Sequence, residues 1–237
     1  RFADPAVDKQ TRKDDKARSD SWYAKLHQSD EGLQSEVKWY DPELDDSAWQ
    51  AITMPGNLPT NGKEFIGVWW LRKTLHLDEV PAEPVTLRLG RIVDADTAYI
   101  NGHEVGGTGY QYPPRRYNVT PDMLKKGENV IAIRITSVGG STGFVLDKAY
   151  FLGTDNARYP LTGEWHYKIA AKMPRLAGST FIRWQPTGLY NAMIAPAIQF
   201  PLAGALWYQG ESNSSAPNDY ANKLTAMINH WRGQWQQ

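Results

Sequence analysis

The chain has 237 residues with a balanced charge, 26 lysine and arginine residues against 26 aspartate and glutamate residues. This balance gives no overall positive field, so neither nucleic acid nor a membrane surface is an expected partner. No stretch approaches the ~18 consecutive apolar residues of a membrane span. The chain lacks cysteine, which excludes disulfides, a thiolate nucleophile and cysteine-type zinc sites. Its 10 tryptophans and 12 tyrosines predict a core filled by large rings.

Residues 1–35 are polar and mixed in charge, with Trp22, Tyr23 and Leu26 as sparse apolar positions. This composition predicts a solvated helix or a linker that docks lightly on its neighbour. The segment begins with Arg1, without an initiator Met or an apolar signal segment. We therefore expect the chain to be a piece of a longer polypeptide.

Residues 36–160 predict an antiparallel β-sandwich. Residues 85–89 alternate apolar and polar side chains, which is the pattern of a half-buried strand. The Asn101-Gly102 dipeptide between two strand-like runs predicts a hairpin turn, because both residues tolerate positive φ. Residues 130–135 are rich in β-branched side chains, and residues 144–152 are expected to form a further strand.

Residues 161–237 predict part of an α/β domain. The apolar run 203–208 is typical of a strand buried on both faces of a parallel sheet. The periodicity of residues 220–231 predicts an amphipathic helix, and residues 217–219 offer a start with a capping side chain. A strand, a polar loop and a helix make half of a βαβ unit.

The polar loop after Tyr208 is the strongest candidate site. Gln209 and Asn213 offer amide donors, Gly210 permits close approach of the backbone, and Glu211 can orient its neighbours. Such donors in a water-poor crevice are what a developing oxyanion needs. The alternative is that these residues only cap the following helix and satisfy the turn, and the spacing alone favours that alternative.

Ser212 is a poor candidate for a nucleophile. Its surroundings lack the last glycine of the Gly-x-Ser-x-Gly pattern, because Ser214 occupies that position. His230 falls on the predicted helix, away from the loop. We therefore expect Ser212 to have a structural or supporting role.

Several aromatic, basic and acidic residues have both a functional and a structural explanation. Five aromatic residues could stack on the faces of sugars, as exposed rings do. Filling of the core is the better explanation for them, because the chain is rich in tryptophan. These residues are Trp69, Trp70, Tyr110, Tyr112 and Tyr117. Arg115 and Arg116 could contact a substrate carboxylate, although a position in a solvated loop is the simpler explanation. Asp94 and Asp96 are explained by local hydrogen bonds within a turn. No His, Asp or Glu cluster has metal-ligand spacing, and no cofactor is expected.

Two strings resemble the sialate O-acetylesterase family, namely Gly188–Pro196 and Gly204–Asn213. Members are SGNH-type serine esterases whose α/β/α domain is interrupted by a β-sandwich. The middle of the chain resembles that inserted sandwich, a galactose-binding-like jelly roll similar to the sugar-binding domains of family-2 glycosidases. The segments that carry this second resemblance are 45–49, 67–73, 94–102 and 126–134.

The resemblance implies a carbohydrate O-acetylesterase similar to sialate 9-O-acetylesterases. Its fold would be a β-sandwich inserted in part of an SGNH hydrolase domain. The family's nucleophilic serine and its Asp/His pair lie in strings that this sequence does not contain, so the chain alone is expected to be inactive. The residues carried over are Gln209, Gly210, Glu211 and Asn213 on the oxyanion side, with Tyr190, Asn191 and Ser212 toward substrate.

The expected partners are an acetylated sugar and the remaining segments of the esterase domain, in a secreted or periplasmic location. The alternative is a non-catalytic β-sandwich module that binds carbohydrate or serves a structural role. That alternative is motivated by residues 37–152, which could fold without the C-terminal segment.

Overall fold

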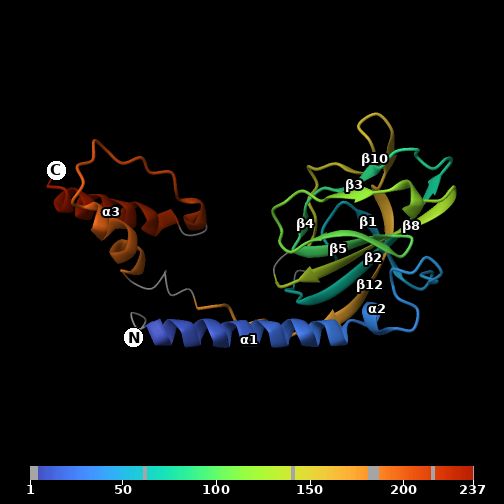
Figure 1. The fold of residues 1–237 in the computed structure, drawn as a ribbon, viewed down its shortest axis with the longest axis horizontal. Helices are drawn as coiled ribbons and strands as arrows, with labels where there is room; N and C mark the ends of the chain where they lie inside the picture. Colours follow the sequence, from blue (N-terminus) through green and yellow to red (C-terminus); the bar gives the residue numbers. More distant parts are fainter. Residues whose placement is uncertain (1–4, 61–62, 140–141, 181–186, 215–216, 237) are drawn as a thin grey trace. The chain divides into compact units, whose positions relative to one another are not determined.

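The computed structural model describes residues 5–60, 63–139, 142–180, 187–214 and 217–236 (Figure 1). The chain divides into two compact units. One unit, Asp14–Gly178, is the sandwich unit, and the other, the C-terminal unit, combines Arg1–Lys13 with Ser179–Gln237. Among the described residues, no helix combines the length and apolarity that crossing a membrane requires.

The polar N-terminal segment forms helix α1 (Pro5–Ser29), which buries only Trp22 and Leu26. Most of its other side chains are solvated, and pairs one turn apart such as Asp8 and Arg12, 2.9 Å apart, support it locally. A short helix α2 (Glu31–Gln34) follows. Asp30 caps α2 by accepting a hydrogen bond from the backbone N–H of Gly32 at 3.0 Å.

The sandwich unit contains one large antiparallel sheet in the order β1-β12-β2-β8-β5-β6. Its middle strands β2 and β8 are the longest and pair along their whole length. The strand bounds are β1 Gln50–Met54, β2 Gly67–Leu77, β5 Ala95–Ile100, β6 His103–Thr108, β8 Gly127–Ser137 and β12 Gly163–Lys172.

A second antiparallel sheet has the order β11-β10-β3-β7. A two-stranded ribbon of β4 and β9 and a 3₁₀ turn, η1 (Pro121–Met123), complete the unit. The remaining strand bounds are β3 Val85–Leu89, β4 Ile92–Val93, β7 Arg116–Val119, β9 Gly143–Phe144, β10 Tyr150–Gly153 and β11 Arg158–Pro160.

The core of the unit joins the inner faces of the two sheets, which makes it a sandwich. Leu71 and Ile133 of the large sheet and Leu87 of the small sheet are fully buried in one cluster. A second apolar cluster includes Trp70, with Trp22 of α1 and Trp39 packed beside it. Trp69 and Trp70 therefore fill opposite clusters, because successive side chains of β2 point to opposite faces of its sheet.

The main strand predictions for this unit are confirmed. β3 alternates buried and partly buried residues, and β5 and β6 form the expected hairpin. Asn101 and Gly102 have φ values of 48° and 87°, as a turn with two left-handed residues requires. The single strand expected over residues 144–152 is wrong, because a turn separates β9 from β10. β12 continues the sandwich past residue 160, where the sequence analysis places its end.

The C-terminal unit is helical where it is regular. The predicted amphipathic helix is confirmed as α3 (Tyr220–Gln234). Its predicted side-chain cap is wrong, because Asp219 makes no capping hydrogen bond and instead pairs with Lys223 at 3.5 Å. Four short turns precede α3, namely the π-helical η3 (Tyr190–Ile194) and the 3₁₀ turns η4 (Ala195–Ala197), η5 (Glu211–Asn213) and η6 (Pro217–Asp219).

The strand expected at residues 203–208 is wrong. The segment is not a strand, and the side chains of Leu206 and Tyr208 are almost fully exposed. A strand buried on both faces needs neighbouring strands on both edges. The described residues of this unit contain no strand that could pair with it.

Candidate functional site

The backbone N–H of Gly210 binds two oxygen atoms from its sequence neighbours. It donates to Oε1 of Gln209 at 2.6 Å and to Oε2 of Glu211 at 3.0 Å. The backbone N–H groups of Glu211 and Gly210 lower the pKa of the Glu211 carboxyl. This N–H therefore already accommodates a negatively charged oxygen at the surface of the unit.

Trp207 and Tyr220 support the loop from behind. The indole Nε1 of Trp207 donates to the Gln209 carbonyl and to the Tyr220 hydroxyl oxygen, each at 2.9 Å. The Tyr220 hydroxyl in turn donates to the Gln209 carbonyl. A Cβ atom added to Gly210 would lie 3.1 Å from the Tyr220 hydroxyl oxygen. Glycine therefore leaves room for the hydrogen bond between the Tyr220 hydroxyl and the Gln209 carbonyl.

Sequence reasoning missed the supporting role of Trp207 and Tyr220. The sequence pattern places Tyr220 only within the amphipathic helix of residues 220–231 and Trp207 only within the apolar run 203–208. Both rings carry one polar atom, and such atoms usually find a partner. That polar atom is the available signal, but Tyr220 reaches the Gln209 carbonyl and the Trp207 indole from 11 and 13 positions away, which spacing does not reveal.

The other residues of the loop are accessible to different degrees. Gln209 and Glu211 are exposed, whereas Gly210 and Asn213 are half-buried. Asn213 donates its backbone N–H to the Gly210 carbonyl at 2.9 Å, which closes the turn η5. The side chain of Ser212 lies outside the described part of the structure. The loop is thus an open surface turn rather than part of a packed interior.

Tyr190 and Asn191 lie in η3, apart in sequence from the loop. The Tyr190 ring packs edge-on against the ring of His230, with centroids 5.3 Å apart. Asn191 donates its backbone N–H to the carbonyl of Thr187 at 2.8 Å. None of these contacts reaches residues 209–213, so the structure does not bring the two predicted parts of the site together.

An apolar groove of about 430 Å³ runs along α3 in the same unit. The rings of Trp207 and Trp231 meet edge-on there, with centroids 6.2 Å apart. No residue of α3 is buried, so its amphipathic face borders this open groove instead of a core. The other lining residues include Leu202, Leu206, Ile228 and Trp235.

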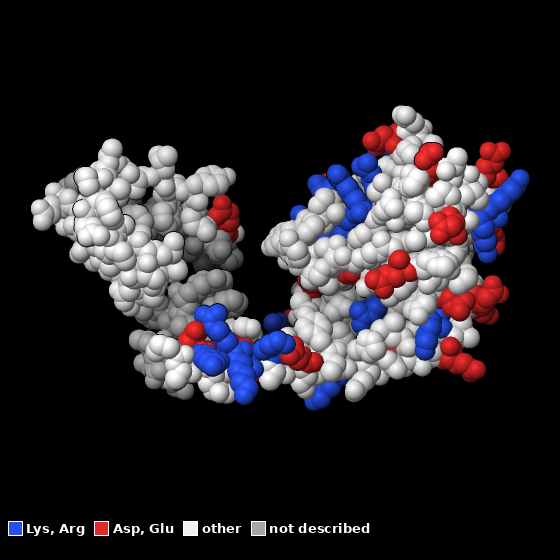
Figure 2. Space-filling model, in the orientation of Figure 1, with Lys and Arg blue, Asp and Glu red and all other residues white. Residues whose placement is uncertain are grey.

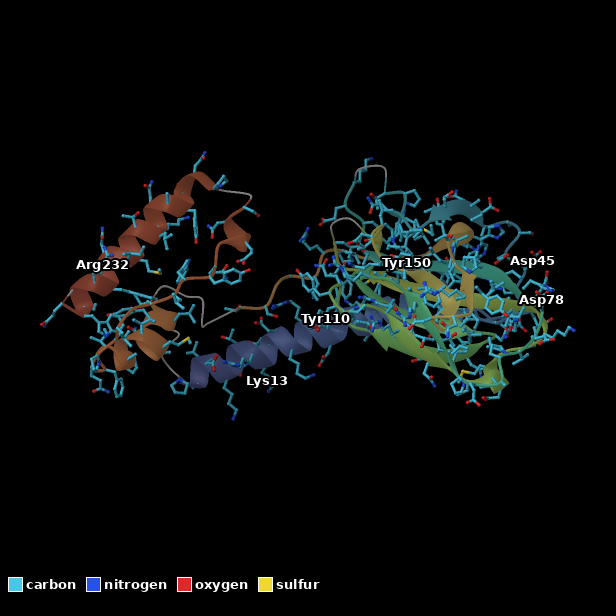
Figure 3. All side chains as sticks on the ribbon, turned by 90° about the horizontal axis from the view of Figure 1, so that it is seen from above. Lys13, Asp45, Asp78, Tyr110, Tyr150 and Arg232 are labelled. Carbon is cyan, nitrogen blue, oxygen red and sulfur yellow. The ribbon has the colours of Figure 1, made fainter. Side chains whose placement is uncertain are left out.

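The predicted core role of most aromatic candidates is confirmed. Trp69, Trp70 and Tyr117 are buried, so they are unavailable to a ligand at the surface. Tyr110 and Tyr112 differ, because 59% and 65% of their surfaces are exposed. Tyr110 lies at the outer edge of the sandwich unit (Figure 3).

The solvated-loop prediction for Arg115 is wrong. Its side chain is fully buried, and Nε donates to Oδ1 of Asp96 at 2.6 Å. The Tyr117 hydroxyl donates to Oδ2 of the same carboxylate at 2.6 Å. Burial raises the pKa of Asp96, against the opposing effect of the hydrogen bonds from Tyr117 and Arg115.

The local turn hydrogen bonds predicted for Asp94 and Asp96 are also wrong. Asp96 holds Arg115 and Tyr117, as described above, and Asp94 accepts from the backbone N–H of Val138 at 2.9 Å. These partners lie 19 to 44 positions away along the chain, where sequence spacing cannot place them. Within the described residues, no cluster of three or more His, Asp or Glu side chains could hold a metal ion.

Residues 173–237 match the family model of the carbohydrate esterases described as sialic acid-specific acetylesterases. This match confirms the family resemblance seen in the sequence. It covers residues 179–237 of the C-terminal unit, including the loop at residues 209–213, and less than half of the chain. A comparison with curated proteins found no match.

Solved β-glucuronidases are similar to the chain over about half of its length. A Bifidobacterium dentium β-glucuronidase is 19% identical over 41% of this chain and 16% of its own, with a TM-score of 0.36. A Bacteroides uniformis β-glucuronidase is 25% identical over 54% of this chain and 15% of its own, with a TM-score of 0.37. The chain therefore spans only a small part of these enzymes.

Proposed function

We propose that this chain supplies the oxyanion side of a serine-dependent carbohydrate O-acetylesterase. The match at residues 173–237 suggests acetylesterase activity on sugars. The single observation that supports a role for the loop is the Gly210 N–H, which already binds a carboxylate oxygen at an accessible turn. Sialic acid esters, such as 9-O-acetyl sialic acid, are the proposed substrates, and the proposed location is outside the cytoplasm.

The proposed reaction is acyl transfer to a serine. A serine outside residues 1–237 attacks the acetyl carbonyl, and a histidine held by an aspartate takes the serine proton and gives it to the departing sugar oxygen. Water, activated by the same histidine, then attacks the acetyl-serine, which releases acetate and returns the proton to the serine. The negative charge that develops on the carbonyl oxygen is received by the Gly210 N–H and by the amides of Gln209 and Asn213. Each such donor typically contributes ~2.7–4 kcal/mol to stabilising the transition state.

The present hydrogen bonds of Gly210 define what must change when substrate binds. The side-chain oxygens of Gln209 and Glu211 occupy the N–H, so an oxyanion has to replace them. Rotation of the Gln209 and Glu211 side chains frees the N–H, and rotation of Gln209 also turns its amide toward the substrate. Trp207 and Tyr220 hold the Gln209 carbonyl meanwhile, so the backbone of the turn stays in place.

The proposed fold of the whole enzyme is an SGNH-type α/β/α domain interrupted by the β-sandwich. Such a domain would supply the partner strands that the described residues of the C-terminal unit lack, so residues 203–208 would pair there and bury their exposed apolar side chains. The polar loop then lies at the carboxyl end of a strand, where open α/β sheets bind their ligands.

Acetate release from 9-O-acetyl-N-acetylneuraminic acid tests the proposal. The protein is produced from its complete reading frame and compared with the variants Gln209→Ala and Asn213→Ala. We expect each variant to lower kcat by about 10²–10³-fold. The matched control is Asn222→Ala, an exposed amide on α3 whose loss leaves kcat unchanged.

Three outcomes contradict the proposal. The complete protein releases no acetate, or both loop variants keep the parental kcat. In the third, the 237-residue chain alone hydrolyses the ester and loses this activity in Ser212→Ala, which makes Ser212 the nucleophile.

A further inference from the structure

The outer face of the four-stranded sheet carries an unusual set of arginines. Arg116 on β7, Arg88 on β3 and Arg158 on β11 alternate with residues that enter the core, such as Leu87 and Tyr117. We call these three residues the arginine face. All lie in strands, so their positions are fixed by the backbone pairing of the sheet.

Arg88 and Arg116 lie directly opposite each other in the pairing of β3 with β7. Like charges in this position destabilise a sheet, because the Cβ atoms of opposite residues are only about 4.5–5.5 Å apart. Arg116 is exposed and, among the residues that the structure describes, has neither an ion pair nor a hydrogen bond for its side chain. The sheet therefore holds positive charge that the protein itself does not neutralise.

Arg88 and Arg158 lie over the same ring, that of Phe151 on β10. Their Cζ atoms are 5.2 and 4.7 Å from its centroid, within the range of a cation–π contact. Both donate to Oδ1 of Asp155, at the long distances of 3.3 and 3.4 Å. The side chain of Asp155 is 72% exposed, so it neutralises these guanidinium groups only weakly.

The charge on this face is therefore positive overall. One carboxylate, that of Asp155, stands against three guanidinium groups. In the orientation of Figure 1, Figure 2 shows Lys and Arg side chains gathered on the side of the sandwich where β3 lies. Thr86 and Asn118 form the next cross-strand pair on the same face and add a hydroxyl and an amide.

We infer that the arginine face binds the carboxylate of an acidic sugar, between Arg88 and Arg116. Guanidinium groups match carboxylates in shape and charge, and bound carboxylate would remove the repulsion between the two arginines. Thr86 and Asn118 offer partners for sugar hydroxyls beside it. The choice of a sugar rests on the proposed function, because sialic acid carries such a carboxylate in the same molecule as its acetylated hydroxyl.

Calorimetric titration of the 237-residue chain tests this site at low ionic strength. The ligands are 3′-sialyllactose, trigalacturonate as a second sugar carboxylate, and lactose as the neutral control. We expect the acidic sugars to bind and lactose to give no heat. In Arg88→Gln or Arg116→Gln, the Kd should rise about tenfold or more. Arg12→Gln on α1 removes the same charge elsewhere and should leave the Kd unchanged.

Urea unfolding separates lost binding from lost folding. Arg116→Gln should keep the parental stability or gain a little, because it removes a like-charge contact. Binding of 3′-sialyllactose alone, or of both acidic sugars, supports the site and defines its selectivity. Equal binding of lactose, an unchanged Kd in Arg116→Gln, or full displacement of the sugar by equimolar inorganic sulfate overturns it.

These ligands carry no ester, and the readout is heat rather than acetate. A failed esterase assay would therefore leave the binding result valid, and absent binding would leave the esterase proposal untouched.

Discussion

The sandwich unit and the C-terminal unit differ in how far they bury their apolar side chains. In the sandwich, two sheets enclose Leu71, Leu87 and Ile133 completely. In the C-terminal unit, Leu206 and Tyr208 are exposed and α3 buries none of its residues. The difference teaches that local pattern suffices to form a helix, whereas a strand exists only where its partners are present. Four experiments test this contrast, from the largest expected effect to the smallest.

Removal of a buried charge should damage the sandwich most. Asp96→Ala leaves the buried Arg115 without its carboxylate partner. We expect the free energy of unfolding of the sandwich, measured by urea denaturation, to fall by about 3–5 kcal/mol. The control Asp155→Ala, at an exposed ion pair, should change it by less than about 1 kcal/mol. If the two substitutions lowered the free energy of unfolding equally, burial would not be the reason why the Asp96–Arg115 pair contributes to stability.

Matched leucine substitutions test the contrast directly. Leu87→Ala creates a cavity in the core and should lower the free energy of unfolding, measured by urea denaturation, by about 2–5 kcal/mol. Leu206→Ala removes an exposed side chain and should lie within about 0.5 kcal/mol of the parent. A large loss in Leu206→Ala would show that residues 203–208 are packed in solution.

Alkaline pH should destabilise the sandwich through Tyr99. Burial, with a smaller effect of Glu104, raises the pKa of Tyr99 from 10.0 to about 12. The folded state then holds this proton more tightly than the unfolded state, so the stabilisation is present below pH 10 and is lost as the pH rises toward 12. Tyr99→Phe should make the decline in unfolding free energy between pH 10 and 12 shallower. An unchanged slope in this variant would exclude Tyr99 as the cause.

The smallest effect is expected in the C-terminal unit. Asp219→Asn removes the exposed pair with Lys223 at the start of α3. Helix content, followed by circular dichroism at 222 nm, should change by an amount that corresponds to about 0.3–0.5 kcal/mol. Because asparagine caps a helix as well as aspartate does, a collapse of the helix signal would instead show that α3 depends on the ion pair with Lys223.

The sequence predicts those parts of the fold that are determined by residues close together in the chain. The Asn101-Gly102 turn, the alternating strand at Val85–Leu89 and the helix at Tyr220–Gln234 each follow from a short pattern. The predictions that failed depend on distant partners. Arg115 and Asp96 find each other across 19 positions, and residues 203–208 lack a strand to pair with among the described residues.

The same division applies to the candidate site. The loop at Gln209–Asn213 was recognisable from its residue types and its resemblance to a family. The hydrogen bonds from Trp207 and Tyr220 that support this loop could not be predicted, because they form only when α3 packs back toward the loop. The cross-strand pair of Arg88 and Arg116 was equally hidden, since it depends on the register of β3 with β7.

The position of β12 has a consequence for synthesis on the ribosome. β12 is the last strand of the sandwich to be translated, yet it lies inside the large sheet, between the edge strand β1 and the central strand β2. Until it emerges, one edge of β2 is open along residues such as Trp69 and Trp70, and β1 has nothing to pair with. An unprotected hydrophobic edge invites pairing with other chains. Nascent chains stalled before Gly163 should accordingly be the form most prone to aggregate and most in need of a chaperone.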